Sequence, residues 1–459
     1  MANEMEEVVT PSIEEQISSL IEEKKYAKIR NLFVEMEPAD IATLLNDYPR
    51  ENSVILFRLL SKELAADVFV EMDSDVQEHF IKTFSDTELR DIMDEIYLDD
   101  AVDIVEEMPA NVVKRILANT DADTRSMINK ILQYPEDSAG SIMTVEYVSL
   151  RKNMTVGEAI IRIRRTGVDK ETIYTCYVTD YNRTLLGIVS AKDLLLSEEE
   201  TIIGDIMDTN IISVHTHDDR EEVTQKFAKY DFLAMPVVDD ENRLVGIVTI
   251  DDAIDVMQEE ATEDIKKMAA IRPVDKPYFQ TSVWQTYKAR IPWLLILMVS
   301  ATFTGLIITK FEDALSVSIA LSAAIPMLMD TGGNSGGQVS VTIIRALSLD
   351  EIHFKDLFKA LWKEFRVGIL CGITLAIVNF LKMLIIQPDV GVLVMATISI
   401  ALFCAVILAK IVGCLLPMFA QKIGFDPAVM SSPFITTIVD ALTLLIYFNA
   451  AVLIMGISA

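Results

Sequence analysis

The chain has 459 residues and a formal net charge of −29, with 51% hydrophobic and 24% charged residues. Residues 291–459 hold 9 Lys and Arg against 10 Asp and Glu, a net of −1, which leaves −28 of the −29 for residues 1–290. This division predicts an acidic soluble part and an apolar membrane part, in two to four domains. The acidity argues against nucleic acid or anionic lipid as partners and favours cations.

The cysteines and the N-terminus narrow the class of protein further. Cys176, Cys371, Cys404 and Cys414 have no spacing typical of a zinc site or a disulfide framework. The N-terminal sequence MANEMEEVVTPSIEEQ lacks the apolar core of a secretory signal peptide. We therefore expect the soluble part to lie in the cytosol.

Residues from about 12 to 135 have the pattern of short amphipathic helices. FVEMEPADIATLLND, LSKELAADVFVEM and VEEMPANVVKRIL each place apolar residues at helical spacing after a Pro, Ser or acidic start. The helices recur at intervals of about a dozen residues, which favours a small superhelix of stacked helices. We assign residues 1–137 to this acidic helical N-domain.

Two related modules follow the N-domain. The sequences LLGIVSAKDLL and LVGIVTIDDAI place Gly187 and Gly246 59 residues apart, and each module opens with an Ile-Met pair. The order strand, turn, strand, helix, repeated twice, predicts a tandem α+β unit. Cys176 falls in one of the expected strands. We assign the modules to residues 138–200 and 201–258.

This tandem resembles a pair of CBS domains, which are regulatory modules. In some CBS pairs the Ser or Thr and the Asp of a G-h-h-[S/T]-x-x-D pattern contact the ribose of an adenine nucleotide. The resemblance implies this role for Ser190, Asp193, Thr249 and Asp252. The alternative is that these residues only cap the helices that follow.

A charged segment connects the modules to the membrane part. DDAIDVMQEEATEDIKKMAAI, which starts at Asp251, predicts a helix, and RPVDKPYFQ predicts a proline-broken linker. We assign residues 259–285 to this connecting helix and linker, which would couple the modules mechanically to the membrane domain at 286–459.

The apolar part contains five candidate membrane spans of roughly 20 residues or more. They lie at about 289–310, 315–344, 364–387, 390–418 and 430–457. The loop at 345–366 carries five Lys and Arg residues, whereas QPDVG carries none. The positive-inside rule then predicts a cytosolic N-terminus and an external C-terminus. An odd number of spans makes one chain an unlikely complete pore, so we expect a symmetric dimer.

The second candidate span contains PMLMDTGGNSGGQ, which does not suit a lipid-facing helix because lipid offers no hydrogen-bond partners. The glycines permit close helix packing, or they break the helix and expose carbonyls to an ion. We expect both, and we interpret the segment as part of a polar conduit. Its residues are Pro326, Asp330, Gly332, Gly333, Asn334, Gly336, Gly337 and Gln338.

A second acid, Asp440, lies in PFITTIVDALTLLIYF, which has no basic residue. It is either a protonated or hydrogen-bonded structural acid or, as we favour, a cation ligand in the path. Carboxylates, carbonyls and hydroxyls without a thiolate or imidazole cluster suit magnesium better than zinc or copper. We find no nucleophile–base pair and predict that the chain is not an enzyme.

The acidic N-domain, the CBS pair, the glycine-rich signature and the late SSPFITTIVD together resemble the MgtE family of bacterial magnesium channels and transporters. The resemblance implies a homodimer in the bacterial inner or plasma membrane, with a pore at the dimer interface and a connecting plug helix. It implies magnesium import down the electrochemical gradient, and closure by cytosolic Mg²⁺ bound at acidic interfaces. The alternative is a CBS- and nucleotide-regulated transporter of another divalent cation or a small solute.

The resemblance also implies the ligands. Those in the pore would be Asp440, Ser432 and Thr436. Those of the cytosolic sensor would be Asp67, Asp99, Asp103, Gly140, Glu221, Asp231, Asp252, Asp255, Glu260, Glu263 and Asp264. The implied cofactors are Mg²⁺ and, at the CBS pair, ATP or another adenine nucleotide.

Overall fold

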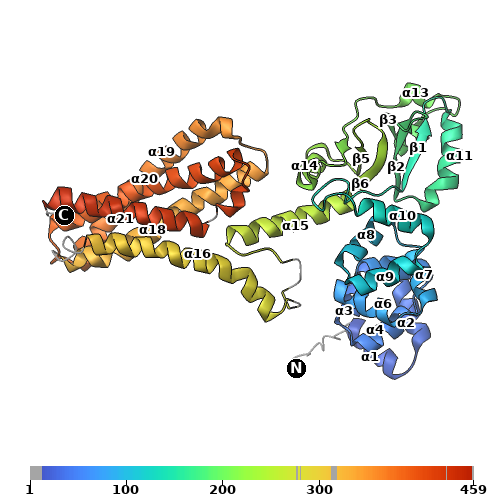
Figure 1. The fold of residues 1–459 in the computed structure, drawn as a ribbon, viewed down its shortest axis with the longest axis horizontal. Helices are drawn as coiled ribbons and strands as arrows, with labels where there is room; N and C mark the ends of the chain where they lie inside the picture. The colour runs from blue at the N-terminus through green and yellow to red at the C-terminus, as the bar shows by residue number, and fades with distance from the viewer. Residues whose placement is uncertain (1–12, 275–277, 280, 312–317, 431, 457–459) are drawn as a thin grey trace, which may run out of the picture. The chain divides into compact units, whose positions relative to one another are not determined.

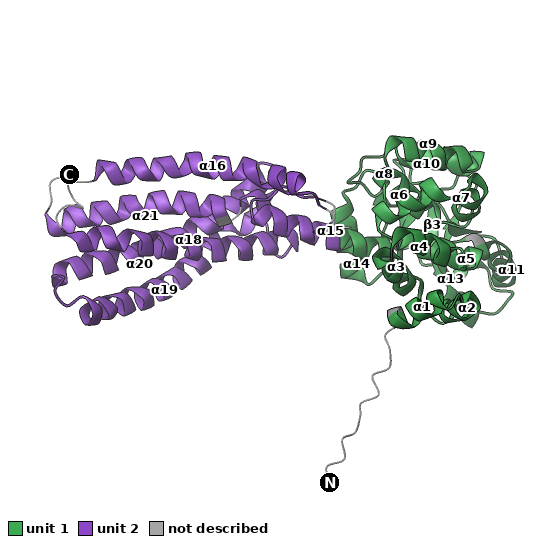
Figure 2. Ribbon diagram, turned by 90° about the horizontal axis from the view of Figure 1, so that it is seen from below, with its two compact units in different colours: residues 1–257 green, residues 258–459 purple. Residues whose placement is uncertain are grey.

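The computed structural model describes residues 13–274, 278–279, 281–311, 318–430 and 432–456. The chain divides into two compact units, residues 1–257 and residues 258–459 (Figure 2). Unit 1 contains the helical N-domain and two small sheets, and unit 2 is a bundle of long helices.

Short helices fill the N-domain, as the sequence predicts (Figure 1). Their ends have local causes: Pro38 opens one helix, and Ser85 and Glu88 form a reciprocal capping box at another. Their apolar faces meet in one core, where the ring of Phe57 contacts those of Phe80 and Phe84. The helices are α1 (Ile13–Glu22), α2 (Tyr26–Val34), α3 (Pro38–Asp47), α4 (Arg50–Phe57), α5 (Lys62–Val70), α6 (Ser74–Thr83), α7 (Asp86–Met93), α8 (Leu98–Glu107), α9 (Ala110–Asn119) and α10 (Ala122–Ile131).

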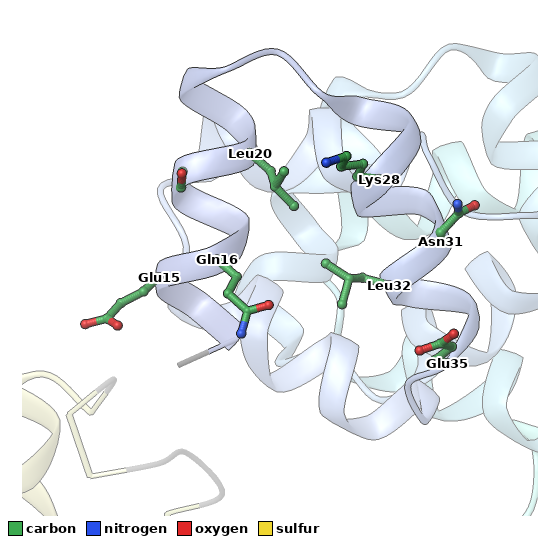
Figure 3. Close-up of a pocket in the computed structure, with 8 residues that line it drawn as sticks. Glu15, Gln16, Leu20, Lys28, Asn31, Leu32 and Glu35 are labelled. Atoms are coloured by element: carbon green, nitrogen blue, oxygen red, sulfur yellow. The ribbon is translucent and has the colours of Figure 1, made fainter. Parts of the chain in front are cut away.

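A surface hollow of about 630 Å³ lies between α1 and α2 (Figure 3). Leu20 and Leu32 form its apolar part, and Lys28 and Asn31 stand beside them. No residue that the sequence predicts to be functional lines this hollow, so it does not contribute to the candidate sites described below.

The two modules have the predicted strand–turn–strand order. In each three-stranded sheet the first strand pairs parallel with the second, and the second pairs antiparallel with the third. The strands are β1 (Tyr147–Arg151), β2 (Thr172–Thr179), β3 (Leu185–Ser190), β4 (Val214–His215), β5 (Ala234–Val238) and β6 (Leu244–Thr249). The helices are α11 (Val156–Thr166), α12 (Ala191–Leu196), α13 (Ile203–Ile206) and α14 (Arg220–Tyr230), with a 3₁₀ turn, η1 (Gly167–Asp169).

The Ile-Met pairs explain the repeated glycines. A Cβ atom on Gly187 would lie 2.8 Å from Sδ of Met207, and one on Gly246 would lie 2.8 Å from Sδ of Met143. The opening segment of each module therefore packs on the last strand of the other module. Two isolated β-bridges, Thr144 with Ile247 and Ile188 with Asp208, hold these opening segments on the strands of the other module. Neither module is built from one continuous segment.

The connecting helix lies where DDAIDVMQEEATEDIKKMAAI predicts it, but the domain boundary that we placed at residue 259 falls inside this helix. Helix α15 (Ile250–Met268) begins directly after β6, so residues 250–258, which we assigned to the second module, already belong to it. It ends before the prolines of the linker. The expected range of 259–285 therefore starts in the middle of a helix.

Unit 2 contains long helices that run side by side (Figure 2). Four helices in the described part are long and apolar enough to cross a membrane: those within 283–310, 354–386, 392–422 and 433–455. The expected count of five is not confirmed, because α18, at the expected span 315–344, carries too many polar residues and glycines. The elements are α16 (Val283–Lys310), α18 (Ile319–Ser348), η2 (Phe354–Asp356), α19 (Leu357–Ile386), α20 (Val392–Lys422), η3 (Pro427–Val429) and α21 (Ser432–Met455).

The glycine-rich segment does not break its helix, so that part of our expectation is wrong. Helix α18 is continuous from Ile319 to Ser348 and includes Pro326. Its glycines serve close packing instead: a Cβ on Gly333 would lie 2.6 Å from Cγ2 of Thr436, and one on Gly413 of α20 would overlap the carbonyl oxygen of Gly336. A continuous helix does not expose the carbonyls of its glycines to an ion in the way that a broken helix would.

Candidate cation sites

Three carboxylates converge in unit 1 from separate segments. The backbone N–H of Leu98 donates to Oε2 of Glu146 at 3.2 Å, which places the first turn of α8 beside the start of β1. The backbone N–H of Glu171 donates to the carbonyl oxygen of Glu146 at 3.0 Å. As a result, oxygens of Asp99, Glu146 and Glu171 lie within 4.8 Å of one another. This is a ligand set of the kind that hard divalent cations take.

Asp99 is buried, and Glu146 and Glu171 are half-buried. Asp99 is only 6% exposed, and Oε2 of Glu171 is buried without a hydrogen-bond partner. No described residue forms an ion pair with Asp99 or Glu171. Two unit charges about 4.8 Å apart repel by roughly 3 kcal/mol at an effective dielectric constant of 20. A cation between them would turn that repulsion into attraction.

Burial and neighbouring acids raise the pKa values of Asp99 and Glu171. Burial, and then the charge of Asp100, raises the pKa of Asp99 to about 7. Burial, and then Asp99, raises the pKa of Glu171 to about 8. The same two causes raise the pKa of Asp252, in the first turn of α15, to about 8. Without a bound cation, a rise in pH through 7 to 8 would therefore ionise Asp99, Glu171 and Asp252, and their charges would then repel one another.

Two other predicted sensor residues of unit 1, Asp103 and Asp255, lie near acids of this region, and the remaining ones are not part of the three-carboxylate group. Partial burial, and then the charge of Asp252, raises the pKa of Asp103, one turn after Asp99 on α8. Burial, and then Asp251, raises that of Asp255. The remaining predicted residues are not part of the three-carboxylate group: Asp67 on α5, Gly140 beside Thr216, Glu221 in the first turn of α14, and Asp231 at its left-handed C-cap.

Sequence reasoning missed Glu146 and Glu171. They share no periodicity with Asp99, and only the pairing of β1 with the segment before β2 brings them together. The one available signal was that Glu146 follows the first Ile-Met pair by three residues, next to the strand that starts the module.

The predicted nucleotide residues form helix caps. The hydroxyl of Ser190 accepts from the backbone N–H of Asp193 and donates to its Oδ2 at 2.6 Å. In the second module the hydroxyl of Thr249 donates to Oδ2 of Asp252 at 2.6 Å. The capping interpretation is thus supported for both pairs, and nucleotide binding stays a prediction.

In unit 2 the end of α15 carries predicted sensor residues, among them Glu260, Glu263 and Asp264. Glu263 already has a cationic partner, Lys267. Nζ of Lys267 lies 2.6 Å from Glu263 and 2.7 Å from Asp426, the residue before η3. Burial, and then Asp426, raises the pKa of Asp264.

The polar residues of α18 form a stripe on one exposed face. Asp330, Asn334 and Gln338 recur at intervals of four residues and are exposed, whereas Gly332, Gly333, Gly336 and Gly337 are buried on the other side. The side-chain amide of Asn334 donates to Asp330 at 3.1 Å. Such a stripe is incompatible with lipid, so it marks a water-filled or protein-covered face.

The carboxyl group of Asp440 on α21 interacts electrostatically with that of Asp330. Oδ1 of Asp440 is buried and has no hydrogen-bond partner. Four residues earlier, Thr436 packs against Gly333. Ser432 begins α21, but its side chain lies outside the described part of the structure.

Long apolar helices that carry Asp330 and Asp440, preceded by a CBS-like pair and a helical domain, have the organisation of a membrane transport protein with a soluble domain. Family models agree along the chain: the MgtE intracellular N domain matches residues 36–137, the CBS domain matches 139–199 and 203–259, and the divalent cation transporter MgtE matches 325–450.

Curated relatives extend this agreement to the whole chain. The magnesium transporter MgtE of Thermus thermophilus is 36% identical over 455 residues, 98% of this chain and 99% of that protein. The magnesium transporter MgtE of Bacillus subtilis is 33% identical over 440 residues, 95% of this chain and 96% of that protein. The chain therefore belongs to the MgtE family. Because these relatives are transporters, the prediction that the chain is not an enzyme is confirmed.

Solved structures match the soluble part. The cytosolic domain of the Mg²⁺ channel MgtE in complex with ATP is 37% identical, with a TM-score of 0.50, and covers 52% of this chain and 98% of that one. The soluble part of a magnesium transporter is 31% identical, with a TM-score of 0.51, and covers 54% of this chain and 97% of that one.

Proposed function

We propose that the chain forms a magnesium-selective channel or transporter that imports Mg²⁺ down its electrochemical gradient and closes when cytosolic Mg²⁺ binds its acidic interfaces. Membership of the MgtE family supports transport of a divalent cation. The observation that carries the proposal is the unpartnered Oδ1 of Asp440 beside the polar stripe of α18. A bare carboxylate at membrane depth costs about 2.5–3.5 kcal/mol, which a passing cation would offset.

The path requires a second copy of the chain. Asp330, Asn334 and Gln338 are exposed on α18 of a single chain, and lipid cannot satisfy them. We propose a homodimer in which the stripes of two chains, with both copies of Asp440, face one aqueous path. In this arrangement α18 is the fifth span, screened from lipid by its neighbours, and Thr436 and Ser432 line the path with Asp440.

The proposed topology follows from the basic residues and from the loop positions. Asp426 is bonded to α15, so the turn before α21 lies at the same end of unit 2 as α15. The QPDVG loop and the end of α21 lie at the other end (Figure 2). We propose that the first end is cytosolic, as its lysines and arginines favour, and that the C-terminus is external.

Regulation is proposed to begin at Asp99, Glu146 and Glu171, with Asp103, Asp252 and the other predicted sensor acids. The pKa of Asp99 is raised to about 7 by burial and by Asp100, so the group favours a bound positive charge. Magnesium, which takes oxygen ligands and keeps several waters, fits a half-open group of carboxylates. Helix α15 would carry the change from these residues toward the spans as a plug.

Uptake into proteoliposomes tests the transport proposal. The purified chain should admit Mg²⁺ when the side bearing residues 1–290 is low in magnesium, and uptake should fall as magnesium on that side reaches millimolar levels. Manganese, cobalt and calcium in competition would measure selectivity. Uptake that equals that of empty liposomes would refute the proposal.

Nucleotide regulation is a second candidate function of the CBS-like pair. It is favoured by one finding: the matching cytosolic domain was crystallised with ATP. We propose that ATP binds near Ser190 and Thr249 and shifts the magnesium concentration needed for closure. Equilibrium binding of ATP to the full chain, compared with Ser190→Ala and with Thr249→Ala, tests this. Equal affinity in all three proteins would contradict the assignment.

A further inference from the structure

A single lysine joins the end of α15 to the turn that precedes α21. Nζ of Lys267 lies 2.6 Å from Oε1 of Glu263, one turn earlier on the same helix. It also lies 2.7 Å from Oδ2 of Asp426, which is 159 residues further along the chain. The contact therefore fastens two segments that nothing in the sequence places together.

Asp426 connects this contact to the polar helices. Its Oδ1 accepts from the backbone N–H of Ala428 at 2.8 Å and so caps η3, which leads directly into α21 and Asp440. In the same turn the hydroxyl of Ser340 on α18 donates to the carbonyl oxygen of Met430 at 3.1 Å. A movement of Asp426 would thus act on the start of α21 and on the C-terminal third of α18.

The charges around Lys267 are mainly acidic, although Arg345 also acts on Asp264. Glu263, Asp264 and Asp426 are three carboxylates, and the pKa of Asp264 is raised by burial and then by the charge of Asp426. Burial alone would lower the pKa of Lys267, but its bonds to Asp426 and Glu263 offset this and hold its pKa above the ordinary value. The ammonium therefore stays charged, and at 26% exposure it is partly shielded from solvent.

We propose that Lys267 is a built-in cation that latches α15 to the turn before α21, and that this latch sets the magnesium concentration at which the path closes. The proposal rests on closure by cytosolic magnesium, as proposed above. It reassigns Glu263: the lysine holds the position that a divalent cation would otherwise take. Without the ammonium, the three carboxylates repel one another until divalent cations neutralise them, so closure would require more magnesium.

The test is the half-closing concentration of magnesium for the full chain in proteoliposomes. Lys267→Gln should raise it by about two- to fivefold, which corresponds to the upper range of a partly exposed ion pair. Lys267→Arg should leave it near that of the wild type. Asp426→Asn keeps an oxygen that caps η3 but loses the charge, so it should match Lys267→Gln. The double variant should be no worse than either single variant, because both act through one contact.

A matched control separates the latch from a general loss of charge. Lys130→Gln removes an exposed lysine from α10 and should not change the half-closing concentration. An unchanged value in Lys267→Gln would overturn the proposal. A lower value would also overturn it, because it would show that the lysine only keeps magnesium away from Glu263 and Asp426.

A charge exchange gives a second measurement if Lys267→Gln folds poorly. Lys267→Glu combined with Asp426→Lys should close at a lower magnesium concentration than Lys267→Glu alone, and equal values would overturn the latch. If magnesium fails to close the wild type itself, the proposed function fails instead, so the two failures are distinguishable.

Discussion

The acids of unit 1 and those of the helical bundle are held in different ways. In residues 1–257 Asp99, Glu146 and Glu171 converge from three segments joined by a few hydrogen bonds. In residues 258–459 Asp330 and Asp440 stand on long helices whose spacing is set by glycine contacts. Repulsion can separate the first group by moving whole segments, whereas the second is held by a packed frame. This difference favours a conformational switch at the acids of unit 1 and a cation path of fixed geometry at the acids of unit 2.

The largest expected effect concerns the fixed path. Asp440→Asn should reduce magnesium uptake by about 100-fold, which corresponds to about 2.8 kcal/mol of lost cation stabilisation. The fold should survive, because Asn has nearly the same shape and Oδ1 has no partner to lose. Uptake in proteoliposomes is the measurement, and Asp389→Asn in the QPDVG loop is the control. Normal uptake by Asp440→Asn would place the path elsewhere.

The frame itself can be tested at a glycine. A Cβ on Gly413 would overlap the carbonyl oxygen of Gly336, so Gly413→Ala should destabilise the bundle by about 1–3 kcal/mol. Gly305→Ala is the matched control, because no atom lies within 4 Å of the added Cβ. Thermal unfolding in detergent would show the difference. Equal unfolding midpoints for Gly413→Ala and Gly305→Ala would mean that the bundle accommodates the added methyl group and is not a rigid frame.

The switch should depend on a residue that the sequence did not reveal. Glu171→Gln removes one of three converging carboxylates, so half-maximal protection of unit 1 from protease should need several times more magnesium. A tenfold increase would correspond to about 1.4 kcal/mol. Glu200→Gln changes an exposed glutamate of the same module and serves as the control. Identical magnesium dependence in both variants would remove Glu171 from the site.

The smallest expected effect is a dependence on pH. The folded-state pKa values of Asp99 and Glu171 are raised to about 7 and about 8 by burial and by neighbouring acids, well above those of an unfolded chain. Raised carboxyl pKa values contribute stability that is fully present below the unfolded pKa and is lost as the pH rises through 7 to 8.

With divalent cations chelated, unit 1 should therefore be more resistant to protease at pH 6 than at pH 8.5, by about 1–2 kcal/mol for a few coupled groups. Millimolar magnesium should reduce the difference, because a bound cation replaces the protons. A resistance that increases from pH 6 to pH 8.5 without magnesium would contradict the proposed repulsion.

Much of the fold could be predicted because it depends on patterns of residues that are close together in the sequence. The spacing of 59 residues gave both modules, and the apolar periodicity gave the N-domain helices. Contacts between distant segments could not be predicted: Glu146 meets Glu171 through a backbone hydrogen bond, and Met143 covers Gly246 of the other module. The glycines of α18 misled us because a helix break and a close helix contact require the same residue.

The polarity of α18 has a consequence for how the protein is made. An isolated helix carrying Asp330, Asn334 and Gln338 is a poor substrate for insertion into lipid from the ribosome, since each polar group would meet hydrocarbon. Helix α20, whose small residues pack against α18, is translated later. If the chain forms the proposed dimer, the polar face of α18 would be covered only when both α20 and a second chain are present. Biogenesis would then be coupled to assembly, and solitary chains would be exposed to quality-control proteases.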